Sequence, residues 1–208
     1  MIKISFSGIS GSGKTSLLQE VKKILALKYK VNSVEEINGK NPFDNDKRSS
    51  FVSQFFYFSN QVNEENIHAI FPADFLLCDR SVLDQWIYWR HYVSDKEMTR
   101  ALEEKHALLK NLYQFWIQSY DMIFLIRMDL KEFDIREFNT EFRTTDLDYI
   151  KKTEELFLET IKEDNLNVIE IWNNNTIDEC AQKIIEMISD YKNSLASAES
   201  PESPGPTP

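Results

Sequence analysis

The chain has 208 residues and a formal net charge of −10, and apolar residues make up 42% of it. This length suits one sizeable core, since single domains commonly run about 100 to 200 residues. The acidic balance disfavours a protein that wraps duplex nucleic acid without sequence preference, because like charges repel. The two cysteines, Cys78 and Cys180, lack the paired spacing of a zinc cluster or a disulfide framework.

The sequence shows no targeting or membrane signal. No apolar run approaches the roughly 20 residues that span a bilayer. Residues Met1–Phe6 lack the basic start, the long apolar stretch and the cleavage site of a secretory signal. We therefore expect a cytoplasmic protein with no membrane partner.

Short apolar runs recur between longer segments whose apolar residues have helical spacing. The short runs predict five strands, at Ile2–Ser7, Val31–Ile37, Phe75–Asp79, Met122–Arg127 and Val168–Trp172. The longer segments predict helices at Lys14–Lys28, Arg48–Ile70, Val82–Tyr92, Asp95–Tyr120, Leu147–Glu163 and Ile177–Tyr191. Because strands alternate with helices, we expect parallel pairing through right-handed crossovers.

The third and fourth predicted strands are almost entirely apolar. Such strands are typical of a parallel sheet that is covered on both faces. The predicted fold class is therefore α/β, a three-layer sandwich around a central, mostly parallel five-stranded sheet. We expect this domain to span residues 1–193. Residues 194–208 are mostly Ser, Ala, Glu and Pro with little to bury, which predicts a disordered tail.

The segment Gly8–Thr15 reads GISGSGKT and matches the phosphate-binding pattern G-x-x-x-x-G-K-[ST] between a strand and a helix. Three of the five glycines in the chain lie here. Glycine allows positive φ and close backbone approach, so N–H groups can converge on phosphate oxygens at a helix N-terminus. The residues expected to bind the phosphates are Gly8, Ser10, Gly11, Ser12, Gly13, Lys14, Thr15 and Ser16.

This motif predicts ATP and Mg²⁺ as cofactors. Lys14 would reach the β and γ phosphates, and the Thr15 hydroxyl would bind the Mg²⁺ that bridges them. The alternative is a Gly/Ser-rich turn followed by an ordinary helix.

A second candidate site follows the third predicted strand, where Asp79 and Arg80 come next to one another. Ligands of doubly wound sheets bind beyond the carboxyl ends of the strands, so both side chains should project towards the phosphates. The Asp79 carboxylate can hold Mg²⁺ or its waters, and the Arg80 guanidinium can bind a phosphate or steady an acid. The alternative is a helix N-cap with a surface arginine.

With the phosphate loop and Asp79-Arg80-Ser81 in this order, the sequence resembles the P-loop nucleoside and nucleotide kinase superfamily of thymidylate and deoxynucleoside kinases. The resemblance covers roughly Met1 to Ile161. It implies an ATP-dependent kinase whose acceptor is a small nucleoside or nucleoside monophosphate. Related kinases are often dimers, so a homodimer is a further expectation.

The resemblance also implies an acid after the second strand that orients or deprotonates the acceptor hydroxyl. Glu35 and Glu36 both fit, and strand alternation alone does not choose between them. We take Glu36 as the catalytic candidate, and two solvated acids at a strand end are the alternative.

A lid with arginines is implied after the fourth strand. Arg136 and Arg143 are the candidates, and the alternative is a helix surface of mixed charge.

In related kinases the helix after the second strand contacts the acceptor base, which makes Gln54 and Gln61 candidates. The nearby Phe51, Phe55 and Phe58 have the spacing of a core-facing stripe.

Two other functions compete with a small-molecule kinase. One is a kinase that acts on a modified base or an end within DNA, against which the net charge weighs. The other is an ATP-binding regulatory module that transfers nothing, which the intact lysine, threonine and Asp79-Arg80 pair disfavour.

Overall fold

The central sheet of the computed structural model has five strands, all paired in parallel in the order β2-β3-β1-β4-β5. The strands are β1 (Ile2–Ser7), β2 (Val31–Val34), β3 (Phe75–Asp79), β4 (Met122–Arg127) and β5 (Ile169–Trp172). The structure describes residues 1–37, 41–43, 50–130, 146–174 and 176–198. The predicted sheet, including its parallel pairing, is confirmed.

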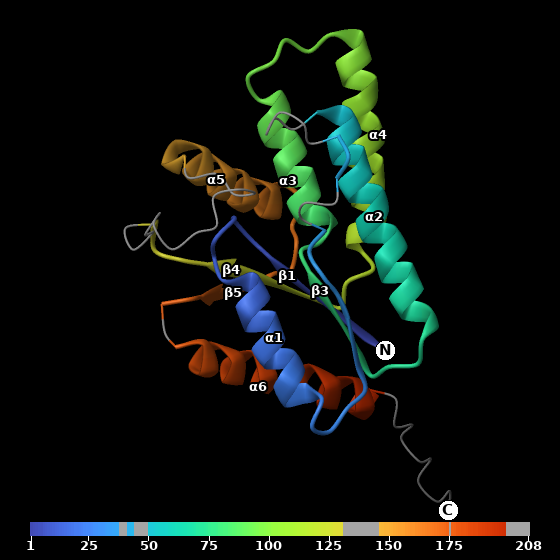
Figure 1. Ribbon diagram of the computed structural model, residues 1–208, viewed down its shortest axis with the longest axis vertical. Helices are drawn as coiled ribbons and strands as arrows, with labels where there is room; N and C mark the ends of the chain where they lie inside the picture. Colours follow the sequence, from blue (N-terminus) through green and yellow to red (C-terminus); the bar gives the residue numbers. More distant parts are fainter. Residues whose placement is uncertain (38–40, 44–49, 131–145, 175, 199–208) are drawn as a thin grey trace, which may run out of the picture.

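Helices cover both faces of the sheet (Figure 1). One face carries α1 (Lys14–Leu25) and α6 (Ile177–Ala198), which pack against each other. The other carries α2 (Phe51–Ile70), α3 (Val82–Val93), α4 (Arg100–Ile117) and α5 (Leu147–Glu163). The predicted three-layer sandwich is therefore confirmed.

The apolar strands are explained by the two hydrophobic cores that they separate. In β3, Leu76 and Cys78 enter the core beneath α3 and α4, whereas Phe75 and Leu77 enter the core shared with α1 and α6. Residues of β4 alternate in the same way. Because both faces of the sheet are buried, residues that point to either face of these two strands are mostly apolar.

The predicted ends of several elements differ from the observed ones. Strand β2 ends at Val34 instead of Ile37. Helix α2 begins at Phe51, because the Ser50 side chain accepts a hydrogen bond from the Ser53 amide and caps the helix there.

The expected start of a disordered tail at residue 194 is wrong. Helix α6 continues to Ala198, so residues 194–198 are helical. The hydroxyls of Ser194 and Ser197 donate to the carbonyls of Tyr191 and Asn193 and stay within the helix. Alanine also favours helix without any burial. Residues 199–208 lie outside the described residues.

None of the helices in the described part of the chain combines the length and apolar character of a bilayer-spanning segment.

The order of the strands decides where the two sequence motifs lie. β3 is the parallel neighbour of β1, with Phe6 opposite Asp79. The loop that follows β1 and the turn that follows β3 therefore leave the same edge of the sheet. The Arg80 amide donates to the Phe6 carbonyl at 3.0 Å, which extends the pairing into the turn.

The packing of α6 against the sheet gives a prediction about stability. Ile184 is completely buried in the core shared with α1, so Ile184→Ala should cost about 2–5 kcal/mol of unfolding free energy. Leu195 lies on the same helix but is 39% exposed, and Leu195→Ala should cost less than about 1 kcal/mol. Urea denaturation of both variants measures the difference. Equal losses would contradict the described packing of α6.

Candidate active site

The loop between β1 and α1 has the backbone of a phosphate-binding loop. Gly8, Gly11 and Gly13 all have positive φ, at 140°, 85° and 86°. A Cβ on Gly8 would lie 2.4 Å from the Ile126 carbonyl oxygen, and one on Gly13 would lie 2.3 Å from Asn173 Nδ2. Both positions therefore require glycine. No side chain caps the start of α1 at Gly13, so its first amides face the loop without a side-chain acceptor there.

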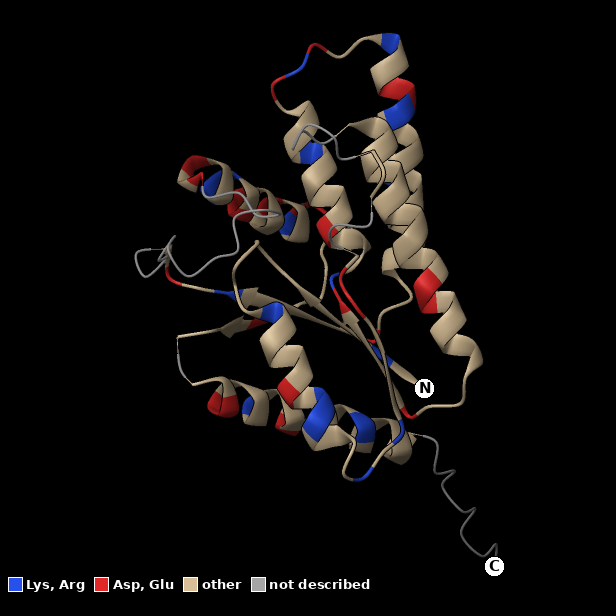
Figure 2. Cartoon of the chain, viewed as in Figure 1, with Lys and Arg blue, Asp and Glu red and all other residues tan. Residues whose placement is uncertain are grey.

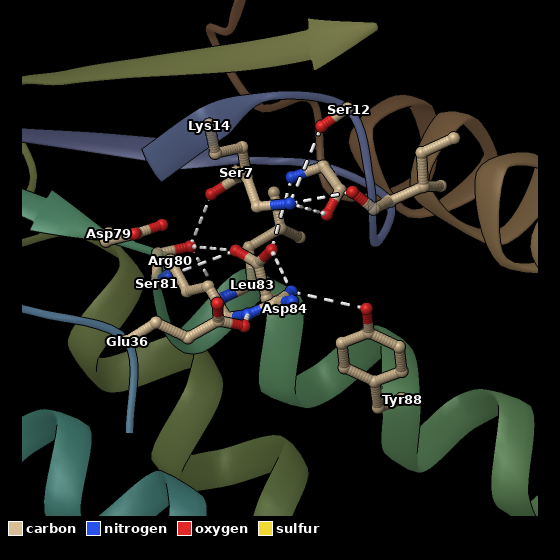
Figure 3. Close-up of polar contacts among 12 residues, drawn as sticks. Ser7, Ser12, Lys14, Glu36, Asp79, Arg80, Ser81, Leu83, Asp84 and Tyr88 are labelled. Carbon is tan, nitrogen blue, oxygen red and sulfur yellow. Dashed lines mark hydrogen bonds and ion pairs between the residues drawn. The ribbon is translucent and has the colours of Figure 1, made fainter. Parts of the chain in front are cut away.

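The Lys14 ammonium lies inside this loop (Figure 3). Its Nζ donates to the carbonyl oxygens of Gly8 at 3.0 Å and Ile9 at 2.7 Å, and contacts Ser12 Oγ at 3.5 Å. These bonds satisfy a charge that is only 4% exposed. Burial, and then the neighbouring Arg80, lower the pKa of Lys14 to about 8.

Thr15 and Asp79 meet between the two motifs. The Thr15 hydroxyl donates to Asp79 Oδ2 at 2.6 Å. The other carboxylate oxygen, Oδ1, is buried and has no hydrogen-bond partner among the described residues. Burial is the largest influence on this carboxyl and raises its pKa.

This oxygen pair fits the divalent cation that the motif implies. A hydroxyl and a carboxylate are hard oxygen ligands, and Oδ1 of Asp79 retains its capacity to accept. Within the ranges that the structure describes, no group of three or more His, Cys, Asp or Glu side chains could hold a metal. Few protein ligands are typical of Mg²⁺, which keeps waters and binds substrate phosphates.

Arg80 is held in a rare conformation beside the loop. Its φ is +78°, although it is not glycine, and its residue is 9% exposed. The guanidinium forms an ion pair with Glu36 through Nε. Its Nη1 contacts Asp84 Oδ1 at 3.4 Å and the Tyr88 hydroxyl at 3.2 Å (Figure 3).

The structure distinguishes the two glutamates that follow β2. Glu36 contacts Arg80, whereas Glu35 is exposed to solvent. Because β2 ends at Val34, strand alternation does not govern either side chain.

Asp84 is the site residue that the sequence did not reveal. Its carboxylate is completely buried and accepts from the Gly8 amide at 3.1 Å through Oδ1. Its Oδ2 accepts from the amide and the hydroxyl of Ser81 at 3.0 and 3.1 Å. Ser81 caps α3 and Asp84 completes the capping box, so the spacing S-x-x-D was the available signal. The cap is thus Ser81, and Arg80 is not a surface arginine.

The predicted lid lies outside the described residues, since Arg136 and Arg143 fall within 131–145. Two arginines outside that segment have structural partners. Arg127 pairs with Glu154 and Glu170. Arg90 pairs with Glu163 and donates to the Thr160 hydroxyl.

The residues expected on α2 are mostly turned into the protein. Gln54 is 3% exposed and Gln61 is 2% exposed. Gln61 Nε2 donates to Glu65 Oε1 at 2.8 Å and to the Arg80 carbonyl at 3.3 Å, so it supports the site from behind. Of the predicted aromatic stripe, Phe58 is buried but Phe55 is 40% exposed.

Comparisons with known proteins agree with this fold. The profile of the AAA domain family matches residues 3–179. No curated protein matches the chain in sequence.

Similar solved structures include a deoxyadenosine kinase and two thymidylate kinases. The deoxyadenosine kinase from M. mycoides, with dCMP and dCDP bound, has a TM-score of 0.67 and 15% identity, covering 91% of this chain and 100% of that chain. Thymidylate kinase from Candida albicans has a TM-score of 0.62 and 18% identity, covering 92% of each chain. Thymidylate kinase from Ehrlichia chaffeensis has a TM-score of 0.64 and 17% identity, covering 90% and 98%. The chain therefore has a P-loop nucleoside and nucleotide kinase fold.

The buried Lys14 gives a prediction about stability and pH. The pKa of Lys14 in the folded chain, about 8, lies below the ordinary 10.5, so between these values the unfolded chain binds more protons. Charging the buried lysine therefore costs folding free energy at neutral pH, on the order of 3 kcal/mol, and the cost disappears as pH rises through this window. Lys14→Met should be more stable than wild type at neutral pH, and the gain should shrink towards pH 10.5.

Urea denaturation across this pH range is the measurement. Lys23→Met is the matched control, because Lys23 lies on the same helix with a 73% exposed side chain. The same pH response in both variants would contradict a buried, charged Lys14.

Proposed function

The chain belongs to the AAA domain family and has a nucleoside and nucleotide kinase fold, and from this we propose that it is an ATP-dependent phosphotransferase acting on a nucleoside. The observation that carries the proposal is the Glu36–Arg80 ion pair beside the phosphate loop and Asp79. It sets a proton acceptor and a cation next to a polyphosphate site. The kinases of the same fold, which are named for a nucleoside and a nucleotide, support this assignment.

On the donor side, the loop amides and Lys14 would bind the phosphates of ATP. Lys14 would exchange the Gly8 and Ile9 carbonyls for phosphate oxygens, which are stronger acceptors for an ammonium. Thr15 and Asp79 would hold Mg²⁺, which when bound neutralises charge on the phosphates. The buried position of Lys14 keeps its electrostatic effect strong, because little water screens it.

On the acceptor side, Glu36 would accept the proton of the attacking hydroxyl. Arg80 fixes the Glu36 carboxylate in place through its ion pair. A carboxylate held in this way supplies general-base catalysis, typically worth about 10²- to 10⁴-fold in rate.

The charges around Arg80 favour an uncharged acceptor over a monophosphate. The carboxylates of Asp79, Glu36 and Asp84 carry three negative charges, and they are the acids that influence the pKa of Lys14. Among the residues that the structure describes, Lys14 and Arg80 supply two positive charges against them. An acceptor monophosphate would add negative charge to this set, whereas a nucleoside hydroxyl adds none.

Arg136 and Arg143 remain the proposed lid arginines, which would meet charge on the transferred phosphoryl group and help exclude water. A cytoplasmic location and a homodimer are proposed from the sequence alone.

The two rival functions have less support. Charges of both signs are interspersed along α5 beside the site, with five acidic and three basic residues (Figure 2). Such a surface would not attract the phosphate backbone of a nucleic acid. A module that only senses nucleotide has no use for the partly buried Glu36–Arg80 pair.

Transfer of the γ-phosphoryl group from labelled ATP to a panel of acceptors tests the proposed function. The panel holds each natural nucleoside, each nucleoside monophosphate and short DNA oligonucleotides, and Lys14→Ala serves as the inactive control. Labelled nucleoside monophosphate is the expected product. Labelled oligonucleotide would favour the DNA rival, and ATP binding without any transfer would favour the regulatory module.

The adjacent glutamates give a matched pair of variants. Glu36→Gln keeps the shape but removes the proton acceptor, so kcat should fall by about 10²-fold or more. Glu35→Gln changes the exposed side chain of the neighbouring residue, which directly follows β2. It should leave kcat near wild type. Steady-state kinetics with saturating ATP compares the two. Equal effects would remove Glu36 from the acceptor site.

The Asp79 carboxylate gives a prediction about metal dependence. Asp79→Asn weakens one oxygen ligand while keeping its shape, so the Mg²⁺ concentration for half-maximal activity should rise by about tenfold or more. Excess Mg²⁺ should restore part of the turnover. Activity titrated against Mg²⁺ for wild type and variant measures this, and an unchanged titration would assign Asp79 a purely structural role.

A further inference from the structure

The turn after β3 holds a residue other than glycine in a rare backbone conformation. Arg80 adopts φ +78°, and a residue other than glycine in this region costs of order 1–3 kcal/mol. Its side chain must nevertheless stay fixed against Glu36 and Asp84. Neighbouring groups must therefore hold the backbone in place.

Two buried side chains bind the backbone of this turn. Gln61 Nε2 donates to the Arg80 carbonyl at 3.3 Å. The Val82 amide donates to the Tyr120 hydroxyl at 3.2 Å. One side chain comes from α2 and the other follows α4, so two segments distant in the sequence bind the backbone between Arg80 and Val82.

Both side chains donate to the same atom, Oε1 of Glu65. The Gln61 amide does so at 2.8 Å and the Tyr120 hydroxyl at 2.5 Å. A tyrosine hydroxyl has one proton, and because it goes to Glu65, the oxygen is left to accept from Val82. Likewise, Gln61 faces a carboxylate and a carbonyl, which both require its NH₂ group on that side. Glu65 thus sets the orientation of both supports.

The Glu65 carboxylate is kept in place by groups on its other side. Its side chain is completely buried and forms an ion pair with Lys3 of β1. The Trp116 indole donates to its Oε2 at 2.7 Å. The Lys3 ammonium lies 4.6 and 4.5 Å from the ring centroids of Trp116 and Tyr120 and donates to Ser119 Oγ at 2.7 Å. The buried carboxylate is therefore paired and hydrogen-bonded, as a buried charge requires.

We propose that Glu65 is a positioning residue that holds Arg80 in its working orientation through Gln61 and Tyr120. Glu65 touches neither Arg80's side chain nor the phosphate loop in the contacts described above, and it acts from the core beneath α2. The inference rests on the proposed function for its effect on turnover, whereas its effect on the position of Arg80 does not.

Tyr120→Phe is the principal test, because it removes one hydroxyl and leaves the ring in place. Tyr113→Phe is the matched control. Tyr113 is also buried, and its hydroxyl donates to Asp164 Oδ2 at 2.7 Å, away from the turn. Glu65→Gln is the second variant, and Tyr120→Phe keeps the test open if Glu65→Gln fails to fold.

The first measurement needs no activity. Hydrogen exchange at Arg80 Nε, which pairs with Glu36, is followed by NMR in each variant. Tyr120→Phe should speed this exchange by about tenfold or more relative to Tyr113→Phe, since loss of one support loosens the turn. Unchanged exchange in Tyr120→Phe and Glu65→Gln would overturn the inference, even if the chain transfers no phosphate.

The second measurement is a cycle of turnover with Arg80→Ala. Tyr120→Phe alone should lower kcat about tenfold with little change in nucleotide affinity, and it should have no further effect when Arg80 is already alanine. Full additivity of the two losses would overturn a role through Arg80. If wild type phosphorylates no acceptor, the proposed function fails, and the exchange measurement still decides the position of Arg80.

Discussion

The carboxylate of Asp84 joins the two segments from which the candidate site is built. One oxygen accepts from the Gly8 amide at the start of the phosphate loop, and the other accepts from the amide and hydroxyl of Ser81 at the start of α3. Leaving a buried acceptor unpaired typically costs about 1–3 kcal/mol, and the cost is larger when the group is charged. The loop and the turn are therefore fixed relative to one another, and the positions of Lys14 and Arg80 follow.

This arrangement concentrates charge in a place that water screens poorly. Lys14 and Arg80 lie among Asp79, Glu36 and Asp84, and burial lowers the pKa of Lys14 and raises that of Asp79. Both shifts show that the charged forms are held at a cost in folding free energy. Such groups gather where a polyphosphate and a divalent cation would bring compensating charge, and perturbed pKa values of this kind are typical of functional sites.

The support of the site extends well beyond the residues that face it. Arg80 has a positive φ, its carbonyl accepts from Gln61 of α2, and the Val82 amide that follows donates to Tyr120 after α4. Particular side chains of this chain, Gln61 and Tyr120, make these contacts.

Local sequence determined the parts of this protein that depend on neighbouring residues. The glycines of the loop predicted its positive φ values, because glycine alone adopts them without a steric cost. Short apolar or alternating runs predicted β1, β3 and β4 with their observed bounds.

Only the tertiary structure decided which polar side chains meet. Glu36 rather than Glu35 reaches Arg80, because β2 ends before either residue and the path of the chain beyond Val34 sets their directions. Glu65 looks like a solvated acid in the sequence, next to Glu64 on a helix. It is buried because Lys3, Trp116 and Tyr120, which lie more than 50 residues away along the chain, supply its partners. Hydrogen bonds and ion pairs depend on distances of about 3 Å in space, and no periodicity in the sequence encodes them.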